Sequence, residues 1–429
     1  MKRKRILYVA HNHPGVRPGG AEAYALELYA AMRASPDFEP VFLAKGGPPM
    51  ANTLPPADGV LVSRVNSDPN QYFLYTHGRD YDWLHNTSRD KDACVEAFAD
   101  FLRAYQPDIV HFQHTLFLGF DFIRQVKTTL PNARIVYTLH EYLPICHRHG
   151  QMLRTHNDEP CLEATPRRCA ECFPDIAPAA FFLRERFVKS HFALVDQFLA
   201  PSQFLLQRFV DWGIPREKIL FEEYGRNPHS PEPELNGGRT RNRIGFFGQF
   251  TFYKGPHVLL KAIQHLNEEA ARTRRNGSAE LHAWLHGANL DLQTGSYQNE
   301  FKGLVETNRA SLTLAGKYHV GDVPRLMANV DWIVVPSLWW ENSPLVIQEA
   351  FMNKRPIICS DIGGMAEKVA HDVNGLHFRA GDPRSLAAAL RRATTEPGLW
   401  ERLRAGIPEI YSITDSVRRL SGIYHELLK

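Results

Sequence analysis

Residues 6–33 of this chain read ILYVAHNHPGVRPGGAEAYALELYAAMR, and they set its fold class. Residues 6–10 are apolar and predict a buried strand, a turn rich in glycine and proline follows, and residues 21–33 show a helical pattern. A strand, a glycine turn and a helix in this order open a βα unit. Similar short apolar runs recur, with helical stretches between them, at 40–44, 109–112, 134–139 and 197–200. This alternation predicts a doubly wound parallel sheet.

A stretch rich in proline and glycine at 227–242 interrupts the alternation, which then restarts. This stretch predicts a linker between an N-terminal domain at 1–226 and a C-terminal domain at 243–405. The second domain has its own candidate strands, at 243–247, 280–286, 312–314, 331–335 and 356–359. Two α/β domains joined by a linker suggest a cleft, and ligands of such sheets bind at the carboxyl ends of the strands.

The overall composition excludes several classes of protein. Hydrophobic residues make up 44% of the 429 residues and charged residues 23%, which excludes a disordered chain. Lysine and arginine total 50 against 47 aspartate and glutamate, a balance that argues against nucleic-acid binding. Apolar runs are shorter than the ~18 residues of a membrane span, and the run after the basic start MKRKR is shorter than the ~7–15 residues of a signal peptide. We therefore expect a cytoplasmic protein, with peripheral attachment to the inner face of the membrane as the alternative.

The strongest signal for a functional site is WWENSPLVIQEAF at residues 339–351, which follows a predicted strand and opens a predicted helix. Pro344 suits the first turn of that helix, because its missing N–H has no partner to lose there. The first N–H groups of a helix and its dipole together form an anion site that suits a diphosphate. Glu341 precedes the helix and Glu349 lies inside it, and each carboxylate can accept hydrogen bonds from sugar hydroxyls.

Glu341 and Glu349, with seven residues between them, resemble the E-x7-E motif of the retaining GT-B glycosyltransferases of family 4. Other segments match that family in the same order, at 19–22, 138–141, 248–250, 254–255, 315–316, 331–337 and 361–367. The resemblance implies two Rossmann-like doubly wound domains facing a cleft, with a cysteine-rich insertion at 146–172 in the N-terminal domain. The N-terminal domain would bind the acceptor and the C-terminal domain the nucleotide sugar. A final helix within 406–429 would return to the N-terminal domain.

The resemblance also implies a role for each matching residue. Glu341 would hold hydroxyls of the donor sugar, Glu349 would bind the ribose, and Lys254 would neutralise the departing diphosphate. The residues implied to be catalytic are His140, Lys254 and Glu341. Those implied to bind the donor are Gly19, Gly20, Gly248, Lys254, Tyr318, Glu341, Asn342, Ser343, Pro344, Leu345 and Glu349.

One position departs from the family pattern. The family commonly has arginine where this chain has Gln249, so the second cation that would neutralise the diphosphate is missing from its usual place. Arg17 and Arg226 are the alternative candidates for that role. Two D-x-D patterns, at 80–82 and 90–92, are too short to indicate a metal site, and GT-B enzymes bind diphosphate without one.

These observations predict an enzyme, a retaining hexosyltransferase that moves a sugar from a nucleoside-diphosphate sugar to a glycan, a lipid-linked acceptor or a small molecule. It would need no catalytic metal. Two alternatives remain open. The first is a nucleotide-sugar epimerase or hydrolase of the same fold. The second is a nucleotide-sugar-binding protein without turnover, for which Gln249 is the main argument.

Four of the six cysteines lie within residues 146–172, as Cys146, Cys161, Cys169 and Cys172. A C-x2-C pair with two further thiols is typical of a structural Zn²⁺ site. The segment is polar, so a metal would help it to fold. Unliganded cysteines and a disulfide or iron–sulfur arrangement are the alternatives. Because the segment closely follows His140, we expect it to overhang the cleft and to contribute to acceptor recognition.

Overall fold

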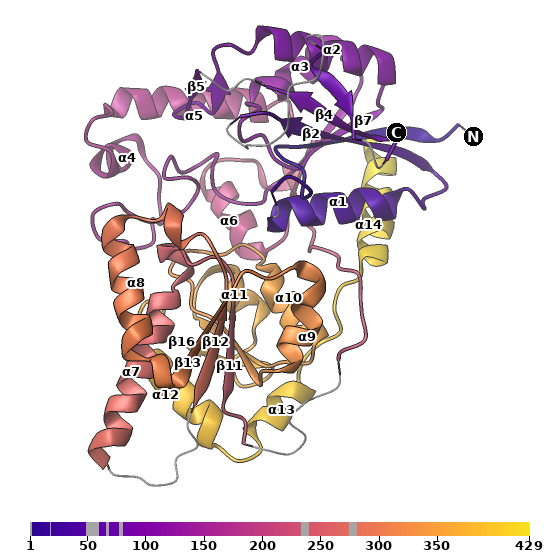
Figure 1. Ribbon diagram of the computed structural model, residues 1–429. Helices are drawn as coiled ribbons and strands as arrows, with labels where there is room; N and C mark the ends of the chain where they lie inside the picture. Colours follow the sequence, from indigo (N-terminus) through magenta and orange to yellow (C-terminus); the bar gives the residue numbers. More distant parts are fainter. Residues whose placement is uncertain are drawn as a thin grey trace. The chain divides into compact units, whose positions relative to one another are not determined.

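The computed structural model describes residues 2–17, 19–48, 60–65, 68–76, 80–232, 240–273 and 281–429. Pro18 of the predicted glycine turn and residues 233–239 of the predicted linker lie outside the described residues. The chain divides into two compact units (Figure 1). Unit 1 comprises Met1–Asn227 and Tyr411–Lys429, and unit 2 comprises Pro228–Ile410. No helix of the described residues is long and apolar enough to cross a membrane.

Unit 1 is built on an eight-stranded sheet with the strand order β10-β9-β8-β7-β1-β2-β4-β3. Its strands are β1 (Lys4–Ala10), β2 (Phe38–Gly46), β3 (Val62–Arg64), β4 (Gln71–Tyr75), β7 (Ile109–Phe112), β8 (Arg134–Thr138), β9 (Gln197–Ala200) and β10 (Ile219–Phe221). All neighbours pair in parallel except β3, which runs antiparallel to β4 at the edge. A small separate hairpin joins β5 (Tyr81–Asp82) and β6 (Thr87–Ser88).

Helices of unit 1 connect these strands, and the last one comes from the end of the chain. They are α1 (Gly20–Met32), α2 (Asp92–Tyr105), α3 (Asp121–Thr129), α4 (Pro166–Cys172), α5 (Pro178–Phe192), α6 (Gln203–Asp211) and α14 (Ile413–Leu427). Helix α14 packs along α1 and reaches the centre of the sheet through Tyr424. The Tyr424 hydroxyl lies 2.7 Å from Nδ1 of His111 on β7 and 3.2 Å from the Tyr8 hydroxyl on β1.

Unit 2 is built on a six-stranded, fully parallel sheet with the order β13-β12-β11-β14-β15-β16. Its strands are β11 (Arg243–Phe247), β12 (His282–His286), β13 (Leu312–Gly316), β14 (Trp332–Val335), β15 (Ile357–Ser360) and β16 (Gly375–Phe378). The prediction of two Rossmann-like α/β units with parallel sheets is therefore confirmed.

Two hydrophobic clusters fill the two faces of the unit 2 sheet. One cluster lies under α7 (Pro256–Thr273), α8 (Gly295–Thr307), α12 (Pro383–Thr395) and α13 (Leu399–Ala405). The other lies under α9 (Val323–Ala328), α10 (Leu345–Met352) and α11 (Gly363–Lys368). Figure 1 shows the two groups of helices on opposite sides of the strands. Both faces are buried, which explains why the strands read as continuous apolar runs.

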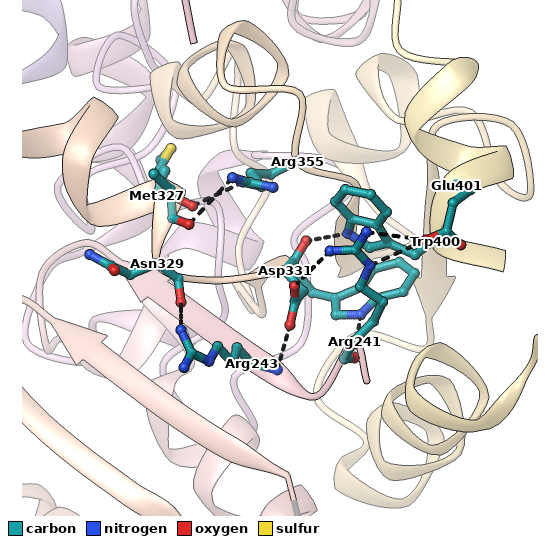
Figure 2. A network of polar contacts seen from close by, with 10 residues as sticks. Arg241, Arg243, Met327, Asn329, Asp331, Arg355, Trp400 and Glu401 are labelled. Atoms are coloured by element: carbon teal, nitrogen blue, oxygen red, sulfur yellow. Dashed lines mark hydrogen bonds and ion pairs between the residues drawn. The ribbon is translucent and has the colours of Figure 1, made fainter. Parts of the chain in front are cut away.

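A polar network ties together the amino ends of β11 and β14 (Figure 2). Asp331 accepts hydrogen bonds from the Arg243 amide at 3.0 Å and from Arg241 Nη1 at 3.4 Å. The Arg241 guanidinium also lies 3.5 Å from the ring centroid of Trp400 and pairs with Glu401 at 3.2 Å. Asp331 precedes β14 and the 339–351 segment follows it, so this network fixes the strands at the end opposite the candidate site.

Candidate functional site

The loop between β14 and α10 presents Glu341, whose side chain is almost fully buried. Its Oε1 atom accepts hydrogen bonds from Lys254 Nζ at 2.5 Å, Ser337 Oγ at 2.8 Å and Trp339 Nε1 at 2.9 Å. These contacts all meet one carboxylate oxygen, so Oε2 keeps its lone pairs for a ligand. The structure therefore brings together the two residues predicted to act on the sugar and on the diphosphate, Glu341 and Lys254.

Lys254 reaches this position because the loops that follow β11 and β14 touch. Lys254 ends a short 3-10 helix, Phe252–Lys254, and the next residue, Gly255, has a φ of +69°. A Cβ atom on Gly255 would collide with the carbonyl oxygen of Pro336. The amide of Leu338 donates to the carbonyl of Tyr253 at 2.8 Å. Only glycine allows this approach and this φ, which accounts for the Lys-Gly pair.

Helix α10 begins beside Glu341, one residue later than its sequence indicates. Pro344 is the N-cap with ψ of 118°, and Leu345 is the first helical residue. Asn342 and Ser343 are buried, and the Gly364 amide donates to the Glu341 carbonyl at 2.7 Å. The first N–H groups of α10 have no partner inside the helix, and they carry the positive end of its dipole. This end of α10 can therefore bind a negatively charged group next to Lys254.

An aromatic cluster lies at the same edge of the sheet. Phe247 at the end of β11 stacks on His286 at the end of β12, with ring centroids 4.6 Å apart, and Tyr318 meets Phe247 edge-on at 5.6 Å. Burial, followed by the charge of Glu349, raises the pKa of Tyr318, which places Glu349 on α10 near that phenol. Gly248 follows Phe247, and its amide donates to the His286 carbonyl at 3.0 Å. Sequence reasoning found Tyr318, Glu349 and Gly248 but missed Phe247 and His286.

His140 lies in unit 1, directly after β8. Its Nδ1 is 2.5 Å from the Tyr224 hydroxyl and its Nε2 is 3.1 Å from Oε1 of Gln113. Burial, followed by the neighbouring charge of His114, holds the pKa of His140 well below its usual value. His140 is therefore a neutral imidazole at the carboxyl edge of the unit 1 sheet.

A buried chain of two histidines and two carboxylates lies at the same edge, and sequence reasoning did not find it. His11 Nε2 lies 3.1 Å from Oε1 of Glu22, His114 Nε2 lies 3.1 Å from Oε1 of Glu141, and the two imidazoles stack with centroids 4.3 Å apart. The Leu116 amide donates to His114 Nδ1 at 3.0 Å, so that nitrogen carries no proton and Nε2–H donates to Glu141.

Glu22 occupies the turn where Gly19 and Gly20 were predicted to approach a ligand. A Cβ atom on Gly19 would collide with the Glu22 carboxylate, which turns back over the start of α1. Burial raises the pKa of Glu22, but the hydrogen bond and charge of His11 outweigh it and bring the pKa to about 2. The start of α1 therefore already carries a negative charge.

The candidates for a second cation are in unit 1. Arg17 is exposed, and buried Arg226 lies with its Nη1 3.5 Å from Oε2 of Glu27. In unit 2, Gln249 is an exposed residue next to Gly248. Lys254 is thus the cation that the structure places beside Glu341.

The four cysteines of segment 146–172 are unbridged thiols. They come from the loop after β8, from the turn that follows it and from α4. Within the described residues, no three Cys, His, Asp or Glu side chains form a group that could hold a metal ion as they stand.

Comparisons with known proteins give the same family in both halves of the chain. The family model described as Glycosyltransferase Family 4 matches residues 18–220, and the one described as Glycosyl transferases group 1 matches residues 232–409. A putative glycosyltransferase of Bacillus subtilis, YtcC, is 22% identical over 81% of this chain and 79% of its own length. A D-inositol 3-phosphate glycosyltransferase of Streptomyces bingchenggensis is 23% identical over 94% of this chain and 84% of its own length.

Solved structures agree on the fold. Sucrose-phosphate synthase of Thermosynechococcus elongatus superposes with a TM-score of 0.72 at 18% identity, over 99% of each chain. HepE of Anabaena, in complex with UDP and glucose, superposes with a TM-score of 0.65 at 15% identity, over 99% of this chain and 100% of its own. At these identities the likeness shows the fold alone.

Proposed function

Because the chain belongs to the GT-B glycosyltransferases, we propose that it transfers a sugar from a nucleoside diphosphate donor with retention at the anomeric carbon. The observation that carries this proposal is the juxtaposition of Lys254, Glu341 and the start of α10 at one edge of unit 2. In this reaction the bond between the anomeric carbon and the diphosphate breaks. A bond to an acceptor oxygen forms on the same face, and the acceptor proton leaves with the diphosphate.

Each part of the unit 2 edge has a role in this proposal. Lys254 and the α10 dipole stabilise the negative charge that builds up on the departing diphosphate, and preorganised charges of this kind contribute strongly to catalysis. Oε2 of Glu341 accepts hydrogen bonds from sugar hydroxyls, and Glu349 accepts them from the ribose. Asn342, Ser343, Pro344 and Leu345 surround the diphosphate. The base stacks near Tyr318, with Phe247 and His286 beneath it.

The acceptor would bind at the carboxyl edge of the unit 1 sheet. The Glu22 charge at the start of α1 disfavours a phosphate there, whereas hydroxyl groups suit the carboxylates and neutral histidines of this edge. We therefore favour the uncharged hydroxyls of a glycan or of a lipid-linked sugar as the acceptor group. His140 would lie beside the sugar being transferred. The acceptor-binding end of such a protein works at a membrane surface when its substrate is lipid-linked.

A thermal-stability measurement with UDP, GDP, ADP, CDP and dTDP tests the donor site. UDP comes first, because the related fold of HepE was solved with it. A nucleotide at about 100 times its Kd adds about 2.7 kcal/mol to the free energy of unfolding. The proposal expects one nucleotide to raise the melting temperature with and without EDTA. If no nucleotide raises it, the donor site is wrong.

A turnover measurement separates the proposal from its rivals. Gln249 favours the alternative of a protein that binds a nucleotide sugar without turning it over, since the position lacks a second cation. The proposal expects release of the nucleoside diphosphate that depends on an added acceptor. Release without acceptor would indicate a hydrolase, and binding without any release would indicate a binding protein.

A further inference from the structure

Segment 146–172 has little regular structure of its own, yet its backbone brings four thiols into one neighbourhood. The Gly150 amide donates to the Cys146 carbonyl at 3.1 Å, and the Cys161 amide donates to the Met152 carbonyl at 2.7 Å. A single β-bridge between Leu153 and Pro160 closes the turn between these two cysteines. The other two thiols, Cys169 and Cys172, are three residues apart on α4 and so share one face of that helix.

The sulfur atoms are electrostatic neighbours. Burial, followed by the charges of Cys146, Cys161 and Cys172, raises the pKa of Cys169 to about 12, so all three thiols lie within its range. Cys161 likewise acts on Cys146. The charge of Cys172 also reaches Cys161. Three separate stretches of backbone therefore converge on a common centre of thiols.

The surroundings of these thiols are built for negative charge. Backbone donors from Met152 and Arg148 stabilise the thiolate form of Cys146, and the backbone of Glu163 does the same for Cys161. Cys146 and Cys161 thus each receive a bond from the residue two positions later. A buried thiol core that is only a packing element needs no such donors.

Two arginines complete this arrangement. Arg184, which is buried, acts on Cys146 and Cys169, and Arg154 acts on Cys161 and Cys172 while also pairing with Glu171. Four thiolates around one Zn²⁺ carry a net charge of −2, and these two guanidinium groups match it. Each arginine faces a different pair of thiols.

We propose that Cys146, Cys161, Cys169 and Cys172 bind one Zn²⁺ in a tetrahedral, purely structural site. The thiols do not form a metal-binding group as they stand. Rotation of the cysteine side chains and a small movement of the exposed turn at 155–159 would close the site around the metal, as is usual where metal binding is coupled to local folding. All four positions are taken by cysteine, so this site leaves no open coordination position for catalysis.

The metal would also hold the loop that carries Glu141. Arg184 donates to the carbonyls of Leu143 at 2.6 Å and Pro144 at 2.9 Å, between Glu141 and Cys146. A Cβ atom on Gly150 would collide with the Glu141 carboxylate, so the cysteine segment packs directly against it. Loss of the metal is therefore expected to loosen the unit 1 edge and to leave nucleotide binding in unit 2 intact.

Metal analysis of the purified chain tests this proposal without any assay of turnover. We expect one equivalent of zinc per chain in protein expressed with zinc. We also expect Co²⁺ added to the metal-stripped protein to give the intense thiolate-to-cobalt absorption of a tetrahedral thiolate site. A zinc content well below one equivalent together with no such cobalt band would overturn the proposal.

Variants locate the metal. Cys169→Ser and Cys172→Ser are each expected to lose the zinc, whereas Cys94→Ala on α2, outside the segment, is expected to keep it. Nucleotide-induced stabilisation reports whether unit 2 remains folded in each variant. If a serine variant stays folded and keeps its full zinc content, the assignment of these thiols is wrong. If the serine variants do not fold, the cobalt spectrum of the unaltered protein decides.

Discussion

Lys254 Nζ and Glu341 Oε1 lie 2.5 Å apart, although 87 residues separate them in the chain. Lys254 also lies over the Trp339 ring, 5.5 Å from its centroid, and Trp339 donates to the same carboxylate oxygen. The cation and the carboxylate thus hold each other in a buried, low-dielectric position. A diphosphate next to Lys254 and a sugar next to Glu341 would therefore be adjacent, as the proposed reaction requires.

Removing the cation tests its role in leaving-group stabilisation. Lys254→Ala is expected to lower kcat by roughly 10²–10³, because one preorganised charge in the transition state contributes about that much. Lys261→Ala is the matched control, since Lys261 is a half-exposed lysine of α7 whose ion pair with Glu300 spans 2.6 Å at the surface. Steady-state kinetics of both variants decide the matter, and equal losses in the two would contradict the assignment.

Neutralising Glu341 separates sugar recognition from nucleotide recognition. In Glu341→Gln the bonds from Ser337 and Trp339 can persist, but the charged acceptor for sugar hydroxyls is lost. A hydrogen bond to a charged group contributes about 1.5–3 kcal/mol, so we expect about a 10- to 100-fold weaker Kd for the nucleotide sugar. The Kd of the free nucleotide diphosphate should not weaken, because Lys254 loses a competitor. Equal weakening of both ligands, measured by calorimetry, would speak against this role.

The packing of the Glu341 loop on α11 predicts the effect of a single methyl group. A Cβ atom at Gly364 would collide with the Asn342 carbonyl, so Gly364→Ala is expected to destabilise the protein by about 1–3 kcal/mol and to weaken nucleotide binding. Gly303→Ala in α8 is the control, since nothing lies within 4 Å of its added methyl group and alanine favours the helix by about 0.5–1 kcal/mol. Chemical denaturation of both variants checks the opposite signs.

Glu222 gives unit 1 a pH dependence. It accepts bonds from Tyr411 and Ser416 of the C-terminal segment, and burial raises its pKa to about 7 despite the nearby Arg419. A carboxyl whose pKa rises on folding contributes stability below its unfolded pKa of about 4.5 and loses it as the pH rises through about 7. Relative to Glu222→Gln, the unaltered protein should therefore lose stability between pH 5 and 8. Parallel stability curves for the two proteins over this range would contradict the raised pKa.

The sequence alone placed much of unit 2, because its site residues follow strands that read as apolar runs. The Glu341 to Glu349 segment and Lys254 could be found since a turn, a glycine and a helix start leave local signals. Helix α8 and strand β16 (Gly375–Phe378) gave weaker periodic patterns and were not among the predicted elements.

The unit 1 edge shows what local patterns cannot reveal. The chain from Glu22 through His11 and His114 to Glu141 joins residues up to about a hundred positions apart, and nothing in their spacing pairs them. Gly19 was assigned to ligand approach, whereas the structure shows that it makes room for the Glu22 carboxylate. Strands β3 and β4 were also missed, since they lie at the sheet edge and are only partly buried.

Calorimetric titration of UDP into the unaltered protein, Lys254→Ala and Lys261→Ala measures the central claim most directly. The account predicts that a nucleoside diphosphate, UDP first among those tested, binds the unaltered protein and Lys261→Ala with the same Kd, and that Lys254→Ala binds it at least 10-fold more weakly, about 1.4 kcal/mol. An unchanged Kd in Lys254→Ala, or no binding of any nucleoside diphosphate to the unaltered protein, would contradict a donor site built on Lys254, Glu341 and the start of α10.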